Sequence, residues 1–153
     1  LRSMTISGCA ALGLTHHRAN FEKERTGMTD SDRNEVHRIN LSILMIANPA
    51  RVDSLATHLQ AVNISKARFR SRPFAGTDEI RRMLPKVEIP LRALWGEKDQ
   101  IALPSVEARF AVLREHHPEL ATAIVPDAGH WAAYEQPDEF NKALVYLLNL
   151  STD

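Results

Sequence analysis

The chain has 153 residues, of which 44% are hydrophobic and 25% charged, a composition that excludes disorder and suits one globular core. Its nineteen basic and nineteen acidic residues cancel to a formal charge of zero, which argues against nucleic acid or an anionic membrane as a partner. No apolar run approaches the roughly 20 residues that cross a bilayer, and the single cysteine, Cys9, cannot form an internal disulfide. These features predict a cytoplasmic protein without a membrane partner.

Residues 1–14 are predicted to form a first core strand and the loop after it. Met4 to Cys9 make a short apolar and β-branched run, which is typical of a buried strand. The chain starts with Leu1-Arg2-Ser3, which is neither an initiator methionine nor a signal peptide. We therefore expect the chain to be an interior part of a longer protein.

Residues 15–76 are predicted to be mainly helical. Apolar residues recur at helical spacing between 32 and 47, and a second helix is expected at 52–64, with one apolar face formed by Leu55, Leu59 and Val62. The basic stretch 66–73 could bind an anion, but the neutral charge of the chain favours a solvated helix end and its exit loop.

Residues 77–153 are predicted to alternate between helix and strand. The expected elements are a helix at 77–84, a strand at 91–95, a helix at 105–115, a strand at 120–125 and a helix from 137 to the end. Short loops between a strand, a helix and a second strand indicate a parallel, right-handed crossover. Together with the first strand, the pattern predicts an α/β fold with an incomplete parallel sheet of three strands flanked by helices.

Two polar motifs follow the last two predicted strands. One strand ends in Gly96-Glu97-Lys98-Asp99, and the other leads into Asp127-Ala128-Gly129-His130-Trp131. An imidazole can take the proton of a hydroxyl or thiol nucleophile, and a carboxylate can hold that imidazole in place. We therefore predict that Asp99 and His130 converge at neighbouring strand ends. The 153 residues contain no Gly-x-Ser-x-Gly nucleophile turn.

The same residues resemble the C-terminal signature of α/β-hydrolase fold enzymes. The resemblance rests on Ile89-Pro90 before a strand, on 94–99 at its end, on 126–131 after the next strand, and on Glu135-Gln136-Pro137. It covers most of the chain and is most specific at Asp99 and His130 in combination.

The resemblance implies that Asp99 is the acid and His130 the general base of a serine-hydrolase type of site. It places the nucleophile (Ser, with Asp or Cys as alternatives) and the oxyanion hole upstream of Leu1, so this chain alone is expected to be inactive. Residues 15–76 correspond to the cap or lid, whose helices between 33 and 64 cover the pocket. The expected lining is Met28, Ile43, Met45, Leu59 and Trp131. The expected substrate is an ester, an amide or an activated carbon–carbon bond of a small apolar molecule.

Several residues have alternative interpretations. Asp127 is a rival acid, although its position three residues before His130 favours a local turn hydrogen bond. Cys9 lacks the second glycine of a nucleophile turn and is expected to be a buried small residue. The pairs His16-His17 and His116-His117 suggest a metal, but adjacent side chains point in different directions, so we predict no metal and no other cofactor.

The predicted sheet also has consequences for association. If the first strand normally pairs with a nucleophile-bearing strand, then without that strand it is an open edge, and we expect either a homo-oligomer or association with the missing N-terminal half. The alternative function is a non-catalytic binding or assembly module that retains a remnant of the fold.

Overall fold

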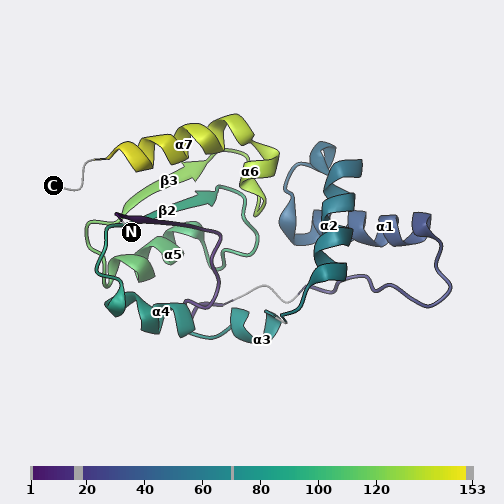
Figure 1. Cartoon of the computed structure of the whole chain (residues 1–153), viewed down its shortest axis with the longest axis horizontal. Coiled ribbons are helices and arrows are strands. Elements are labelled where there is room, and N and C mark those ends of the chain that lie inside the picture. The colour runs from purple at the N-terminus through teal and green to yellow at the C-terminus, as the bar shows by residue number, and fades with distance from the viewer. Residues whose placement is uncertain (1, 16–18, 70, 151–153) are drawn as a thin grey trace.

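A computed structural model describes residues 2–15, 19–69 and 71–150 of the chain. Three parallel strands, β1 (Met4–Ser7), β2 (Leu91–Gly96) and β3 (Ala121–Val125), form a sheet in the order β1-β2-β3. Helices lie on both sides of this sheet, and further helices lie beyond the carboxyl ends of the strands (Figure 1). The predicted α/β fold with an incomplete parallel sheet is confirmed.

The central strand β2 is buried at all six positions, because both of its faces are covered. Leu91, Ala93 and Trp95 pack on one side in a cluster with α5 (Val106–Arg114). Leu94 points to the other side and packs in a cluster with α7 (Pro137–Asn149). Figure 1 shows these two helices on opposite sides of the sheet. The alternation of side chains along a strand therefore divides one apolar sequence between two cores.

The other elements of the C-terminal part precede β2 or follow β3 in the chain. They are α3 (Arg72–Ala75), α4 (Glu79–Met83), the 3-10 turn η3 (Leu84–Lys86) and α6 (Ala132–Glu135). The predicted helix 77–84 is thus shorter, since it gives way to the 3-10 turn that contains Pro85. The short helix α6 was not predicted, and it follows His130 directly.

The residues between β1 and α3 contain a helical pair, which we call the helical segment (residues 30–66). It consists of α1 (Asp30–Asn40), a π-helical turn η1 (Leu41–Met45), a 3-10 turn η2 (Pro49–Arg51) and α2 (Ser54–Lys66). The prediction of a helix at 32–47 was wrong at both ends. Thr29 caps α1 two residues earlier through a capping box with Asp32, and Ile46 is already extended.

The buried face of α2 also differs from the prediction. Ala56 is fully buried, whereas Leu55 and Leu59 are exposed. Asp53 is the N-cap of α2 and accepts a hydrogen bond from the Ala56 amide at 2.9 Å. The first turn of α2, which contains the buried Ala56, is therefore the part of the helix that packs against the protein. Within the described ranges, no helix is long and apolar enough to cross a membrane.

Candidate functional site

Asp99 and His130 meet at the carboxyl ends of β2 and β3. Asp99 Oδ2 lies 3.0 Å from His130 Nδ1, which is hydrogen-bonding distance. The two residues are 31 positions apart in the sequence, and parallel pairing of the two strands brings their end loops together. The predicted convergence of these two side chains is therefore confirmed, while their catalytic roles stay a prediction.

The Asp99 carboxylate is held in place by its own loop. Its side chain is only 2% exposed, and its second oxygen, Oδ1, accepts a hydrogen bond from the Ile101 amide at 2.9 Å. The buried Arg109 of α5 donates from Nη2 to the carbonyl oxygens of Ile101 and Leu103 at 3.0 and 3.1 Å. Burial lowers the pKa of this guanidinium, and the nearby Cys9 and Asp99 oppose that shift. The loop and its carboxylate therefore form one hydrogen-bonded unit.

His130 offers one ring nitrogen for chemistry. When Nδ1 carries the proton, it donates that proton to Asp99, and Nε2 becomes an acceptor. Among the described residues, Nε2 makes no hydrogen bond, and the side chain is 22% exposed. This is the arrangement that a general base requires.

Gly8, at the end of β1, lies directly against the imidazole. A Cβ atom at this position would be 2.8 Å from His130 Cε1, and the φ of Gly8 is +59°. A side chain is therefore excluded for both steric and conformational reasons. All three strands thus contribute to the surroundings of His130.

Asp127 does not take part in this contact. Its carboxylate pairs with Lys98 at 2.6 Å, and its amide donates to Glu97 at 2.9 Å. Both partners belong to the loop after β2, so Asp127 fixes the two strand-end loops against each other. The geometry favours Asp99 over Asp127 as the partner of His130.

Cys9 is a poor nucleophile in this structure. Burial raises the pKa of its thiol to about 11, although the positive charge of Arg109 acts in the opposite direction. At neutral pH the thiol is therefore protonated, and the thiolate is the reactive form. Cys9 packs against the core cluster that contains β2 residues, but it is only partly buried, so the prediction of a buried small residue holds in part.

The other predicted site residues are spread over several environments. Met45 lines a cavity of about 1190 Å³ between the helical segment and the strand ends, together with Ala10, Phe21, Leu44, Ile64 and Ile101. His130 does not line this cavity, but Ala10 lies two residues from Gly8, and the Ile101 amide binds Asp99. The cavity therefore reaches the loops that follow β1 and β2, although neither Asp99 nor His130 lines it.

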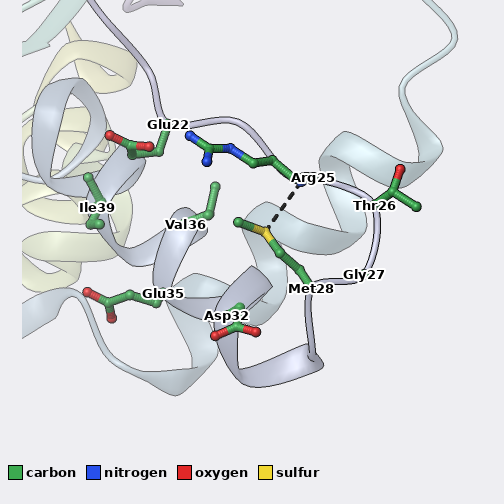
Figure 2. A pocket seen from close by; sticks show the side chains of 9 residues that line it. All are labelled: Glu22, Arg25, Thr26, Gly27, Met28, Asp32, Glu35, Val36 and Ile39. Atoms are coloured by element: carbon green, nitrogen blue, oxygen red, sulfur yellow. Dashed lines mark hydrogen bonds between the residues drawn. The ribbon is translucent and has the colours of Figure 1, made fainter.

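Met28 lines a different depression, of about 500 Å³, between α1 and the residues before it. Figure 2 shows that its thioether lies beside Arg25, whose amide donates to the sulfur at 3.3 Å. Charged side chains such as Glu22, Asp32 and Glu35 surround this depression, which does not suit an apolar substrate. Ile43, Leu59 and Trp131 line neither cavity.

The histidine pairs 16–17 and 116–117 are the residues that suggested a metal. His16 and His17 lie outside the described residues, and the ring of His117 contacts the Leu84 carbonyl oxygen at 3.2 Å. In the ranges that the structure describes, no three His, Cys, Asp or Glu side chains come together as metal ligands.

Three further residues of the site were not identified from the sequence: Gly8, Arg109 and Glu135. Gly8 and Arg109 act through contacts with distant parts of the chain, which no local pattern reveals. Glu135 was noted in the sequence but given no chemical role. Its carboxylate is 1% exposed and accepts hydrogen bonds from the Gly129 and Asn48 amides.

No protein-family model and no curated protein matches the sequence. Solved structures do match the fold. The naproxen esterase from Bacillus subtilis has a TM-score of 0.63 at 15% identity, with 97% of this chain and 51% of that chain covered.

Two further matches are hydrolases by their descriptions. A meta-cleavage product hydrolase from Pseudomonas fluorescens IP01 has a TM-score of 0.60 at 17% identity, with 95% of this chain and 55% of that chain covered. A serine hydrolase involved in carbazole degradation has a TM-score of 0.59 at 19% identity, with 99% of this chain and 55% of that chain covered. The chain thus spans about half the length of the structures that it matches. The chain has the fold of the C-terminal portion of an α/β-hydrolase.

Proposed function

We propose that this chain carries the acid and base of a hydrolase active site, with His130 as the general base and Asp99 as the carboxylate that orients it. The contact of 3.0 Å between the buried Asp99 oxygen and His130 Nδ1 is the observation that carries this proposal. The nucleophile, a serine hydroxyl in the most direct version, comes from a part of the protein outside these 153 residues.

The chemistry follows from the free Nε2 atom. As the hydroxyl oxygen attacks the substrate carbonyl carbon, Nε2 takes the hydroxyl proton, and Asp99 stabilises the imidazolium that results. Nε2 then gives this proton to the leaving group as its bond to the carbonyl carbon breaks. In the second half, Nε2 takes a proton from water, the water oxygen attacks the acyl carbon, and the serine leaves with the proton.

The proposed substrate class is a small apolar molecule with an ester, an amide or an activated carbon–carbon bond. The cavity that Ile101 lines has apolar lining residues such as Phe21, Leu44 and Met45, which support the apolar part of the substrate, and charged ones such as Glu22, Lys23 and Glu24, which do not. The matched structures also support this substrate class, since they include an esterase and a meta-cleavage product hydrolase. In this proposal the helical segment acts as a lid over the cavity.

We also propose that β1 mediates association. It pairs with β2 on one side, and on its other side no strand among the described residues covers it. An uncovered edge of a parallel sheet offers free backbone donors and acceptors. A second copy of the chain, or the part that bears the nucleophile, is the proposed partner, and light scattering that finds a monomer at all concentrations would contradict the first option.

Turnover of a chromogenic ester tests the main proposal. The assay uses this chain, both alone and extended upstream to include the nucleophile, and compares each with His130→Ala and with Asp99→Asn. We expect activity in the extended protein, with both substitutions lowering kcat by factors on the order of 10³ or more. The exposed His58 provides the matched control, and His58→Ala should leave turnover unchanged.

The alternative function is a binding or assembly module without catalysis. It predicts an extended protein whose residual ester turnover is the same in the original sequence and in His130→Ala. That result would remove the catalytic proposal while leaving the fold unaffected.

A further inference from the structure

The buried side chain of Glu135 connects the His130 loop with the helical segment. Its Oε2 atom accepts a hydrogen bond from the Gly129 amide, directly before His130. Its Oε1 atom accepts one from the Asn48 amide at 2.8 Å, and Asn48 lies between the two helices of the helical segment. Glu135 is 87 positions from Asn48 and 6 from Gly129, so its carboxylate joins two chain segments that are far apart in sequence.

The residues before and after His130 both lie against the helical segment. The Trp131 amide donates to the Met45 carbonyl oxygen at 2.8 Å. A Cβ atom on Gly129 would be 2.8 Å from the Ala47 amide nitrogen, so only glycine allows the two backbones to approach in this way. His130 is thus flanked, at 129 and 131, by residues bonded or packed against the helical segment or Glu135.

The chemistry of this bridge requires a carboxylate. Both of its partners are N–H donors, and each carboxylate oxygen accepts one of them. A glutamine has one acceptor oxygen, and its amide group would face the second donor. The two amide hydrogen bonds compensate for the burial of Glu135, and the positive charge of Lys98 also acts on this carboxylate.

We propose that Glu135 is a positioning residue that couples the helical segment to the general base: when the segment moves, the Gly129 amide and therefore the His130 ring move with it. The catalytic meaning of this coupling rests on the proposed function, but the coupling itself does not. Because coupling is reciprocal, a change in the helical segment at Asn48 alters the His130 loop, and a change in that loop alters the helical segment.

The test uses nuclear magnetic resonance of the intact 153-residue chain. Two observables report the coupling: the low-field signal of the His130 Nδ1 proton, and hydrogen exchange at the Gly129 and Asn48 amides. In Glu135→Gln we expect exchange at one or both amides to rise by about ten- to hundredfold. We expect the His130 signal to shift or broaden in the same variant.

Two controls separate positioning from general loss of stability. Glu139→Gln removes an exposed glutamate that pairs with Lys142 and should change neither observable. Leu113→Ala destabilises the core on the α5 side of the sheet, in a buried cluster that contains no residue of 128–135. At equal or greater global destabilisation in urea, it should leave the His130 signal in place.

A second pair of variants changes Asn48 in the helical segment and leaves Glu135 unaltered. Asn48→Pro deletes the N–H that Glu135 binds, whereas Asn48→Ala retains it and removes only the side-chain cap on Ala50. We expect Asn48→Pro, and not Asn48→Ala, to shift the His130 signal and to increase exchange at Gly129. This pair also keeps the test decisive if Glu135→Gln fails to fold.

An unchanged His130 signal in both Glu135→Gln and Asn48→Pro overturns the inference, whether or not the protein hydrolyses esters. Conversely, shifted signals together with ester turnover that does not depend on His130 would retain the coupling and reject the proposed function.

Discussion

The strand region, formed by β1 and residues 91–150, and the helical segment use their apolar side chains differently. In the strand region, β2 is buried at every position and contributes to two core clusters, one on each face of the sheet. The buried cluster of the helical segment consists of Leu41, Ile46 and Ala56. Exposed apolar residues occur in both regions, with Leu55, Leu59 and Ile64 in the helical segment and Val145, Tyr146 and Leu148 in α7, so the difference lies in the buried clusters.

This difference corresponds to a division of tasks. Asp99 and His130 stand on the densely packed region, where strand ends and buried hydrogen bonds fix their separation. The helical segment has few buried contacts, and segments of this kind open at low free-energy cost. It supplies much of the cavity lining, so the part that shapes the cavity is less constrained than the part that holds the pair.

The largest expected effect tests the packing difference directly. Leu94→Ala empties a fully buried position between β2 and α7, and we expect it to lower the free energy of unfolding by about 3 kcal/mol. The matched change Leu55→Ala, at a residue that is 54% exposed, should cost less than about 0.5 kcal/mol. Urea denaturation measures both, and equal losses would show that the two regions are packed alike.

The next largest expected effect is a loss of folding stability at alkaline pH. Because burial raises the Cys9 pKa to about 11 from an ordinary value of 9.0, the folded chain keeps a proton that the unfolded chain loses. Stability that is present below about pH 9 is therefore lost as the pH rises to 11, by an amount on the order of 2 kcal/mol. Cys9→Ala should flatten this part of the curve of unfolding free energy against pH. An unchanged slope would mean that the thiol does not titrate as its burial indicates.

Glycine substitutions compare the residue that follows β1 with one that precedes the helical segment, at positions where both backbones have positive φ. Gly8 and Gly27 both have positive φ, of +59° and +89°, so replacement by alanine should cost about 1–2 kcal/mol at each. At Gly8 the new methyl group also meets the His130 ring, whereas at Gly27 nothing lies within 4 Å. Gly8→Ala should therefore displace the low-field His130 signal, and Gly27→Ala should not. The same signal in both variants would place His130 away from β1.

The smallest expected effect is at the contact between the regions. The Tyr134 hydroxyl donates to Asp53 at 2.6 Å, and this bond lowers the pKa of the Asp53 carboxyl. Tyr134→Phe should increase hydrogen exchange at the Ala56 amide, next to the Asp53 cap, by about three- to tenfold. The exposed Tyr146 provides the control, since Tyr146→Phe should leave that amide unchanged.

The elements that the sequence identified well are those with strong local signals. β2 is an apolar run that ends at a glycine, and α5 has Ser105 at its start and buried Val106, Phe110 and Leu113 at helical spacing. The helical segment was predicted less well, because its apolar residues do not mark its buried face. In α2 the small Ala56 faces the protein, and the larger Leu55 and Leu59 do not.

The sequence by itself determined that a carboxylate and an imidazole follow two adjacent parallel strands, because strand, loop and polar residue are consecutive in the chain. Only the tertiary structure decided how they are supported. Gly8 against the His130 ring, Arg109 behind the Asp99 loop and Glu135 between Gly129 and Asn48 all join segments that are far apart in sequence. Such contacts depend on distances that chain folding sets, and no local pattern of residues encodes them.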